Sequence, residues 1–269
     1  MSDASSARVT RVCAVSFLNT VPLIHGFLHG AQRGLAELSL CVPSECADRL
    51  ENGEADVGLV PVIEIPRLGL KTVSAVGIAC RGAVRSILLV SKVPLREVHT
   101  LAADANSRSS VALARMVLER RHGARPELRK RPPELAAMLA EADAAVLIGD
   151  PALRVSPATT GHRVFDLGQE WFELTGLPMV FATWAARRGV DTSGLGQAFL
   201  ASWRHGMTHL DGIVAAESAA RRLPRELVRD YLTHRIVFEI GEAERSGMAL
   251  YLDYARQSGI LESSGAFSA

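Results

Sequence analysis

The sequence predicts an α/β protein in which buried strands are covered by helices on both faces. Strand and helix signals alternate through the first third of the chain. The apolar runs at 57–63 (VGLVPVI) and 86–92 (SILLVSK) are nearly uninterrupted, as in the parallel strands of sheets that are covered on both faces. With 269 residues, of which 48% are hydrophobic and 22% charged, the chain can bury a large core, and its composition excludes intrinsic disorder.

The first block of the chain alternates strands with short helices. Ser44 can cap the second helix, and Gly53 ends it before the next apolar strand. The strands expected here are 9–17, 38–43, 57–63 and 86–92, and the helices are 21–30 and 44–50.

A second block begins near residue 94 and has strands and helices of its own. Its first helix has one apolar stripe and ends at Gly123 and Pro126. From Asp191 onward the pattern is mostly helical. We expect strands at 98–103 and 144–148, a turn at 149–151, and helices at 109–121, 133–142, 193–210, 212–222, 224–234 and 241–258.

These blocks indicate two lobes rather than one continuous sheet. The apolar extended segments 86–93 and 179–184 flank the second block and could run side by side as a double crossover. Such a crossover leaves a cleft between the lobes, where small ligands usually bind. We therefore expect a first lobe of residues 1–93 and 183–269 and a second lobe of residues 94–182. The C-terminal helices complete the first lobe and could also pair two copies as a homodimer.

Net charge and targeting signals narrow the expected partners and compartment. Lys and Arg total 30 and Asp and Glu total 29, so the formal charge of +1 attracts neither nucleic acid nor anionic membrane. A small molecule is the expected partner. The N-terminus lacks the apolar core of a secretory signal, and no apolar stretch reaches about 18 residues. We therefore expect a cytoplasmic protein.

No metal site is expected from the spacing of the four cysteines and eight histidines. The cysteines lack CxxC spacing and are expected to be reduced core residues. His205 and His209 are four residues apart and could share a helix face, but the sequence shows no third ligand beside them. The chain has no Walker loop, GxGxxG or GxSxG motif, which disfavours ATP, dinucleotide and hydrolase chemistry. The cysteines are Cys13, Cys41, Cys46 and Cys80.

Polar residues follow the first predicted strand. Ser16, Asn19 and Thr20 lie at the carboxyl end of that strand, where open α/β sheets bind their ligands. Asn19 is the strongest candidate because its amide can both donate and accept hydrogen bonds. The alternative is a local role, in which these side chains form a turn and cap the helix that follows.

Ser86 opens an apolar strand and could point into the cleft, with Arg81 or Arg85 supplying positive charge. A serine at the start of a strand beside solvent needs no such role, so this alternative also stays open.

The segment 104–110 (DANSRSS) stands directly before an amphipathic helix. Its serines place hydroxyls and free backbone N–H groups at the positive end of the helix dipole, where a carboxylate or phosphate can bind. The alternative is an ordinary helix cap with spare serines. The substrate-binding candidates in this segment are Ser107, Arg108, Ser109 and Ser110.

Six phrases between residues 10 and 187 recur together in one known family. They are SFLNTVPL, LENGEADVGLVPVIEI, RGAVRSILLVSK, DANSRSS, LIGDPAL and TGLPMVFATW. In this order they resemble the chorismate dehydratases of the futalosine route to menaquinone. The resemblance implies a two-lobed periplasmic-binding-protein-like fold of type II, with mixed sheets flanked by helices and a ligand cleft between the lobes.

The resemblance also implies a lyase that converts chorismate to 3-[(1-carboxyvinyl)oxy]benzoate and water without a cofactor. The enolpyruvyl carboxylate of the substrate is expected to take the ring proton, with Asn19 and Ser86 assisting as catalytic residues. Gly149, in the LIGDPAL phrase, joins Ser16 and Thr20 among the substrate-binding candidates. Phe17 stands where relatives more often have tyrosine, so a phenol hydroxyl is missing at that position.

Two other functions stay open. The 1,4-dihydroxy-6-naphthoate synthases of the same pathway share the fold, but they usually have an SPCPND-like opening and a histidine base, neither of which is found here. A non-catalytic small-anion-binding protein of the same fold is the second alternative. The candidate residues include no obvious Asp, Glu or His base, which favours dehydration assisted by the substrate's own carboxylate.

Overall fold

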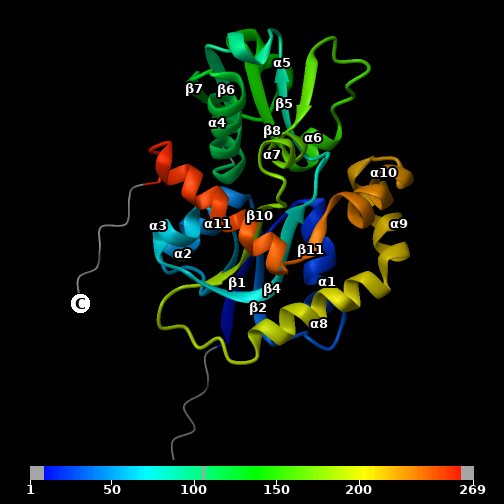
Figure 1. Ribbon diagram of the computed structural model, residues 1–269. Coiled ribbons are helices and arrows are strands. Elements are labelled where there is room, and N and C mark those ends of the chain that lie inside the picture. Colours follow the sequence, from blue (N-terminus) through cyan, green and yellow to red (C-terminus); the bar gives the residue numbers. More distant parts are fainter. Residues whose placement is uncertain (1–8, 105–106, 262–269) are drawn as a thin grey trace, which may run out of the picture.

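The computed structural model describes residues 9–104 and 107–261, whose strands form two mixed sheets (Figure 1). The first has the order β11-β4-β10-β3-β1-β2 and the second the order β7-β6-β8-β5-β9. The strands of the first sheet are β1 (Thr10–Val15), β2 (Ala36–Cys41), β3 (Val57–Pro61), β4 (Lys71–Cys80), β10 (Met179–Ala186) and β11 (Val237–Glu239). Those of the second are β5 (Ile87–Ser91), β6 (Thr100–Asp104), β7 (Glu127–Arg131), β8 (Ala144–Ile148) and β9 (Arg163–Asp166).

Helices cover both sheets, and the last one joins them. In Figure 1 the second sheet lies above the first, and α11 runs across the front of the lower lobe and approaches α4 of the upper one. The helices of the chain up to the second sheet are α1 (Val21–His29), α2 (Pro43–Glu51) and α3 (Glu64–Leu68). The next are α4 (Ser109–His122), α5 (Leu135–Glu141), α6 (Gly149–Leu153) and α7 (Leu167–Thr175). The last are α8 (Leu195–Thr208), α9 (Leu210–Arg221), α10 (Arg225–Asp230) and α11 (Glu242–Gln257). Among residues 9–104 and 107–261, no helix is both long and apolar enough to cross a bilayer.

The position of β5 corrects the expected lobe boundary. This strand pairs antiparallel with β8 and β9, so it belongs to the second sheet and does not run beside β10. The chain therefore leaves the first lobe between β4 and β5, before Ser86, rather than after Val93. It returns between α7 and β10, before residue 179 rather than after residue 182. The apolar sequence of β5 correctly predicted burial. A strand buried on both faces has the same apolar sequence pattern in either sheet and with parallel or antiparallel neighbours.

The C-terminal helices form where their hydrophobic periodicity predicts them. Helix α8 packs on α1 and β4 and completes the first lobe. Helix α11 packs on β10 and also reaches α4 of the second lobe. There the Tyr251 hydroxyl donates a hydrogen bond of 2.9 Å to the carbonyl oxygen of Ser109. The start of α4 is thus held by both lobes.

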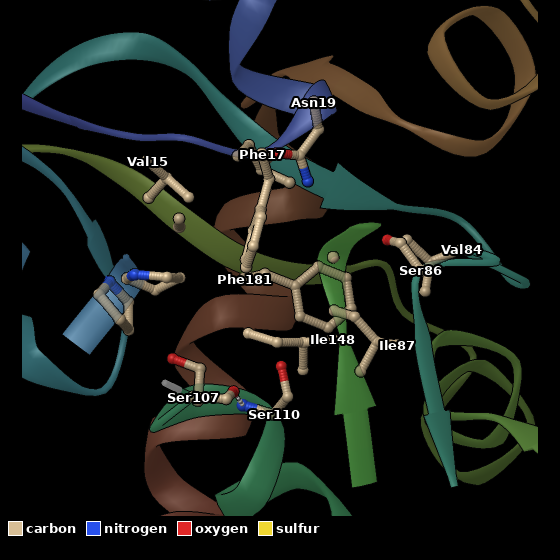
Figure 2. Close-up of a pocket in the computed structure, with 16 residues that line it drawn as sticks. Val15, Phe17, Asn19, Val84, Ser86, Ile87, Ser107, Ser110, Ile148 and Phe181 are labelled. Carbon is tan, nitrogen blue, oxygen red and sulfur yellow. Dashed lines mark hydrogen bonds between the residues drawn. The ribbon is translucent and has the colours of Figure 1, made fainter. Parts of the chain in front are cut away.

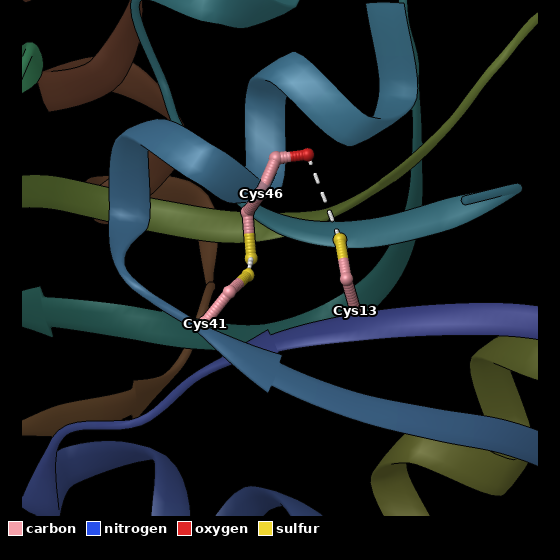
Figure 3. A group of neighbouring side chains, drawn as sticks. All are labelled: Cys13, Cys41 and Cys46. Carbon is pink, nitrogen blue, oxygen red and sulfur yellow. Dashed lines mark hydrogen bonds between the residues drawn. The ribbon is translucent and has the colours of Figure 1, made fainter. Parts of the chain in front are cut away.

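Three cysteines meet beneath α2 (Figure 3). Cys41 Sγ lies 3.1 Å from Cys46 Sγ, and Cys13 Sγ lies 3.5 Å from the carbonyl oxygen of Cys46. All three, like Cys80, are free and buried, which confirms their expected place in the core. Their convergence was not visible in the sequence, since one comes from each of β1, β2 and α2.

Candidate active site

A cavity lies where the chain passes between the lobes, the position at which two-lobed proteins usually bind small molecules. Figure 2 shows Asn19 on one side of it and Ser107 and Ser110 on the opposite side, with Ser86 on a third. These residues come from the turn after β1, the passage before β5 and the start of α4. Residues far apart in the sequence therefore contribute polar groups to one space.

Three buried polar side chains form a hydrogen-bonded chain beside this cavity. The Asn19 amide nitrogen donates to the Tyr231 hydroxyl at 3.0 Å, and that hydroxyl donates to Ser86 Oγ at 2.8 Å. Burial raises the pKa of Tyr231, so its hydroxyl is protonated and neutral at physiological pH. Tyr231 begins a π-helical turn (Tyr231–Arg235) after α10. The sequence carried no signal for this residue, because its surroundings read as an ordinary amphipathic helix.

Two groups of this hydrogen-bonded chain remain able to bind a ligand. Asn19 Oδ1 is buried and has no hydrogen-bond partner among the described residues. Ser86 Oγ accepts a hydrogen bond from the Tyr231 hydroxyl, so the Ser86 hydroxyl can donate its own hydrogen bond to a ligand. A buried acceptor without a partner costs roughly 1–3 kcal/mol. A ligand that donates to Asn19 and accepts from Ser86 would remove that cost.

The start of α4 forms the opposite polar wall. The Ser110 backbone N–H donates to Ser107 Oγ at 3.3 Å, and both side chains line the cavity (Figure 2). Ser109 also lines it, but its hydroxyl oxygen already accepts a hydrogen bond of 3.4 Å from the Ile63 N–H. Because α4 has 14 residues, its first turn is the positive end of a substantial helix dipole. This wall favours a negatively charged ligand group.

The remaining lining is apolar. It includes the rings of Phe17 and Phe181 and the side chains of Ile87 and Ile148. Within the described part of the chain, no residue that lines the cavity has an ionisable side chain. The cavity therefore offers hydrogen bonds and a helix terminus to an anion, and its described lining residues include no carboxylate or imidazole that could act as a general base.

The structure separates the residues predicted from the sequence into two groups. Ser16 and Thr20 lie outside the cavity and line a neighbouring hollow beside α1 and α9. Thr20 Oγ1 is buried there without a hydrogen-bond partner among the described residues. Asn106 of the DANSRSS phrase lies outside the described residues. The predicted residues that line the cavity are Asn19, Ser86, Ser107, Ser109, Ser110 and Gly149.

The arginines near the cavity bind other protein groups. Arg108 donates to Asp48 at 2.6 Å and to Glu64 at 3.1 Å, so it forms ion pairs with first-lobe carboxylates and is not part of the lining. Arg81 pairs at 2.8 Å with a buried glutamate of α11. The Arg85 guanidinium donates to backbone carbonyls at and after the end of α6. The expectation that Arg81 or Arg85 supplies charge to the cleft is therefore wrong.

Asp150 fixes the turn that carries Asn19. One of its carboxylate oxygens accepts a hydrogen bond of 3.1 Å from the Leu18 N–H, and the other pairs with Arg221 of α9. Asp150 belongs to α6 of the second lobe, whereas Leu18 and Arg221 belong to the first. This contact connects the two lobes directly beside the cavity.

Gly149 is expected to tolerate no side chain. Its φ of 60° is in the left-handed region, and an added Cβ would lie 2.6 Å from the Phe17 ring. Gly149→Ala should lower the free energy of unfolding by the backbone strain, about 1–2 kcal/mol, plus about 1–3 kcal/mol for overpacking. Chemical denaturation monitored by circular dichroism measures the loss.

Gly123→Ala is the matched control for this variant. Gly123 also has a left-handed φ, of 67°, but an added Cβ would meet nothing within 4 Å. In this control the free energy of unfolding should fall only by the backbone strain, about 1–2 kcal/mol. Equal losses in the two variants would contradict the predicted clash with Phe17.

The fold is that of a two-lobed α/β protein with a cavity between its lobes. Solved structures that share this fold include the following three. A protein of Archaeoglobus fulgidus is 18% identical, with a TM-score of 0.75 over 95% of this chain and 100% of that chain. The alkanesulfonate-binding protein of Xanthomonas axonopodis pv. citri, bound to MOPS, is 14% identical, with a TM-score of 0.69 over 97% and 96%. The periplasmic aliphatic sulphonate-binding protein of Escherichia coli is 17% identical, with a TM-score of 0.64 over 96% and 90%.

The chain belongs to the menaquinone biosynthesis family, whose pattern matches residues 10–257. A chorismate dehydratase of Thermus thermophilus is 30% identical over 257 residues, which cover 88% of this chain and 92% of that protein. The two-lobed periplasmic-binding-protein-like fold expected from the sequence is thereby confirmed.

Proposed function

We propose that this protein is a chorismate dehydratase, which removes water from chorismate to form 3-[(1-carboxyvinyl)oxy]benzoate and so opens futalosine-dependent menaquinone biosynthesis. The observation that carries the proposal is the hydrogen-bonded chain from Asn19 through Tyr231 to Ser86, beside a cavity whose described lining residues include no ionisable side chain. The name of the relative from Thermus thermophilus supports the same activity.

The proposed reaction breaks two bonds on neighbouring ring carbons. The enolpyruvyl carboxylate of the substrate takes a ring proton, and the electron pair of that C–H bond forms a new ring double bond. The hydroxyl group leaves the adjacent carbon as hydroxide, and the proton taken up by the substrate carboxylate is passed to it to form water. The ring becomes aromatic. The protein then needs no base of its own, which fits the neutral lining of the cavity.

Asn19 and Ser86 act on the leaving hydroxyl in this proposal. Asn19 Oδ1 accepts the hydrogen of that hydroxyl and so orients its oxygen. Ser86 donates its own hydrogen to the same oxygen as negative charge develops there. Because Ser86 Oγ accepts a hydrogen bond from Tyr231, its O–H is polarised and becomes a better donor. A preorganised donor of this kind stabilises the transition state more than the bound substrate.

The start of α4 holds the ring carboxylate. Ser107 and Ser110 face it with hydroxyls, and the first turn of α4 adds the positive end of its dipole. Hydrogen bonds to a charged group contribute about 1.5–3 kcal/mol each. The rings of Phe17 and Phe181 enclose the cyclohexadiene and exclude water from the reacting atoms.

Incubation of the purified protein with chorismate tests the activity. Ultraviolet absorbance and mass spectrometry should show loss of one water and a new benzoate spectrum. Binding of chorismate without turnover would instead indicate a receptor of the same fold. Turnover of a cyclic futalosine derivative would indicate a dihydroxynaphthoate synthase, although none of the described lining residues is a histidine. Either of these results would contradict the proposal.

Tyr231→Phe should lower kcat about 10-fold or more, with a smaller effect on KM. The variant keeps the ring but removes the hydroxyl that polarises Ser86 and holds the Asn19 amide. It should also lose roughly 1–3 kcal/mol of stability, because two buried polar groups lose their partner. Steady-state kinetics well below the melting temperature separate the two effects.

Tyr254→Phe is the control for the loss of a phenol hydroxyl. The Arg120 guanidinium carbon lies 3.7 Å from the centre of the Tyr254 ring, and this ring does not line the cavity. Its kinetics should match those of the unmodified protein. An unchanged kcat in Tyr231→Phe would show that the hydrogen-bonded chain has no part in turnover.

A further inference from the structure

Two packed helices bring four histidines together outside the candidate active site. His25 and His29 are one turn apart on α1, whereas His205 lies in the last turn of α8 and His209 directly follows that helix. The His25 ring centre lies 4.7 Å from that of His29 and 5.1 Å from that of His205. The ring centres of His205 and His209 are 4.2 Å apart. The sequence showed one such pair, and the packing of α1 on α8 adds the other.

The backbones of α1 and α8 are held close beside this cluster. Ser202 Oγ accepts hydrogen bonds from the N–H groups of Gly26 and Phe27, at 3.0 and 3.3 Å. A Cβ added to Gly26 would lie 2.5 Å from Ser202 Cα, and one added to Gly206 would overlap the Pro22 carbonyl. The residues next to His25 and His205 are therefore fixed by contacts that leave no space for larger side chains. A rigid scaffold of this kind preorganises the imidazoles.

The ring nitrogens have the separations that one metal ion requires. One nitrogen from each of His25, His205 and His209 lies within 4.8 Å of the other two. The Nδ1 atoms of His25 and His205 are 3.0 Å apart. Two nitrogen ligands on a tetrahedral zinc ion, each about 2.0–2.1 Å from the metal, are about 3.3 Å apart. The His25 and His205 nitrogens thus lie close to the separation of two ligands on one zinc ion.

A backbone contact orients the third imidazole. His209 Nδ1 lies 2.8 Å from the carbonyl oxygen of His205, and a carbonyl can only accept a hydrogen bond. Nδ1 must therefore carry the proton, which leaves the lone pair on Nε2 for a metal. Hydrogen bonds of this kind commonly orient histidines that bind metals.

The four imidazoles are not paired with carboxylates among the described residues, and solvent reaches them. None of these four histidines forms an ion pair with a carboxylate in residues 9–104 or 107–261. His25 and His29 also line the hollow between α1 and α9, and His29 and His209 are exposed. An ion has a route to the cluster from solvent.

We propose that His25, His205 and His209 bind one divalent transition-metal ion, with His29 or water as the fourth ligand. Neutral imidazoles favour Zn²⁺ and its neighbours Co²⁺, Ni²⁺ and Cu²⁺ over Mg²⁺ or Ca²⁺. The site joins α1 to α8 and so stabilises the first lobe. It lies outside the cavity, and no step of the proposed dehydration uses it, so the two proposals can be tested separately.

Titration of tag-free, chelator-treated protein with Zn²⁺ tests the site. Calorimetry should show one ion per chain, and saturating Zn²⁺ should raise the melting temperature. Co²⁺ should give the visible spectrum of a tetrahedral nitrogen-ligated ion. His209→Ala, which changes an exposed side chain, and His205→Asn should each weaken Zn²⁺ binding at least about 10-fold. His99→Ala is the matched control, because it removes an exposed histidine elsewhere, and it should leave binding unchanged.

Three results would overturn this assignment. One is the absence of saturable Zn²⁺ binding, and another is undiminished binding in His209→Ala and His205→Asn. The third is a thiolate-to-cobalt charge-transfer band, which would place the ion at Cys13, Cys41 and Cys46. Chorismate turnover in the chelator-treated protein is measured in parallel, and its presence or absence does not bear on the metal site.

Discussion

Asn19→Ala is expected to lower kcat for chorismate dehydration by about 100- to 1,000-fold, the loss typical when one group that binds the reacting atoms is removed. Both ends of this amide have a role. The nitrogen holds the Tyr231 hydroxyl at 3.0 Å, and the oxygen is buried without a partner beside the cavity. The change in KM should be much smaller, because the carboxylate contacts lie on α4. Initial rates of product formation over a range of chorismate concentrations measure both constants.

Thr20→Val provides the comparison for Asn19→Ala. Thr20 is the next residue along the same turn, and the structure places its hydroxyl outside the cavity. Valine keeps its shape, so turnover should be preserved. A large loss in Thr20→Val would restore the assignment made from the sequence. Full turnover in Asn19→Ala would remove Asn19 from the mechanism, and melting curves of both variants establish that they are folded.

Ser110→Asp is expected to weaken chorismate binding at least about 100-fold. The second position of α4 is favourable for aspartate, because a negative charge there stabilises the positive end of the helix dipole. The variant should therefore fold. Its carboxylate would stand against the carboxylate of the substrate, and two like charges about 4 Å apart near a protein surface repel by about 4 kcal/mol.

Ser110→Asn has nearly the same shape as Ser110→Asp without the charge. It should weaken binding less than about 10-fold, the loss of about one hydrogen bond. The difference between the two variants therefore isolates the electrostatic effect. Calorimetric titration with chorismate, or KM where turnover is measurable, gives the comparison. Similar affinities in the two variants would show that no substrate carboxylate lies at the start of α4.

Local patterns predicted most of the elements and part of the site. The helices from α8 to α11 formed where hydrophobic periodicity placed them, because each buries one stripe against the first sheet or its neighbours. The serines at the start of α4 were identified as a candidate anion site, since a helix terminus needs only local sequence to be recognised. Asn19 and Ser86 were identified by their positions at strand ends and by the family resemblance.

Local sequence patterns did not predict contacts between residues that are far apart in the sequence. The sequence placed β5 in the first lobe because an apolar strand does not reveal which sheet it joins. It placed Arg85 in the cleft, although the guanidinium instead hydrogen-bonds carbonyls at and after the end of α6. Ser16 and Thr20 are adjacent to Phe17 and Asn19 in sequence, yet both line the hollow beside α1 and α9 instead of the cavity.

The sequence by itself determined the α/β class, the two-lobed organisation and the chemical character of the candidate site, because these follow from periodicity and from the residue types at strand and helix ends. Only the tertiary structure decided that Tyr231 joins Asn19 to Ser86, and that His25 meets His205. The physical reason is that a hydrogen bond acts over about 3 Å in space. Tyr231 is 145 residues from Ser86, and His25 is 180 residues from His205, so only the packing of the helices could bring them within reach.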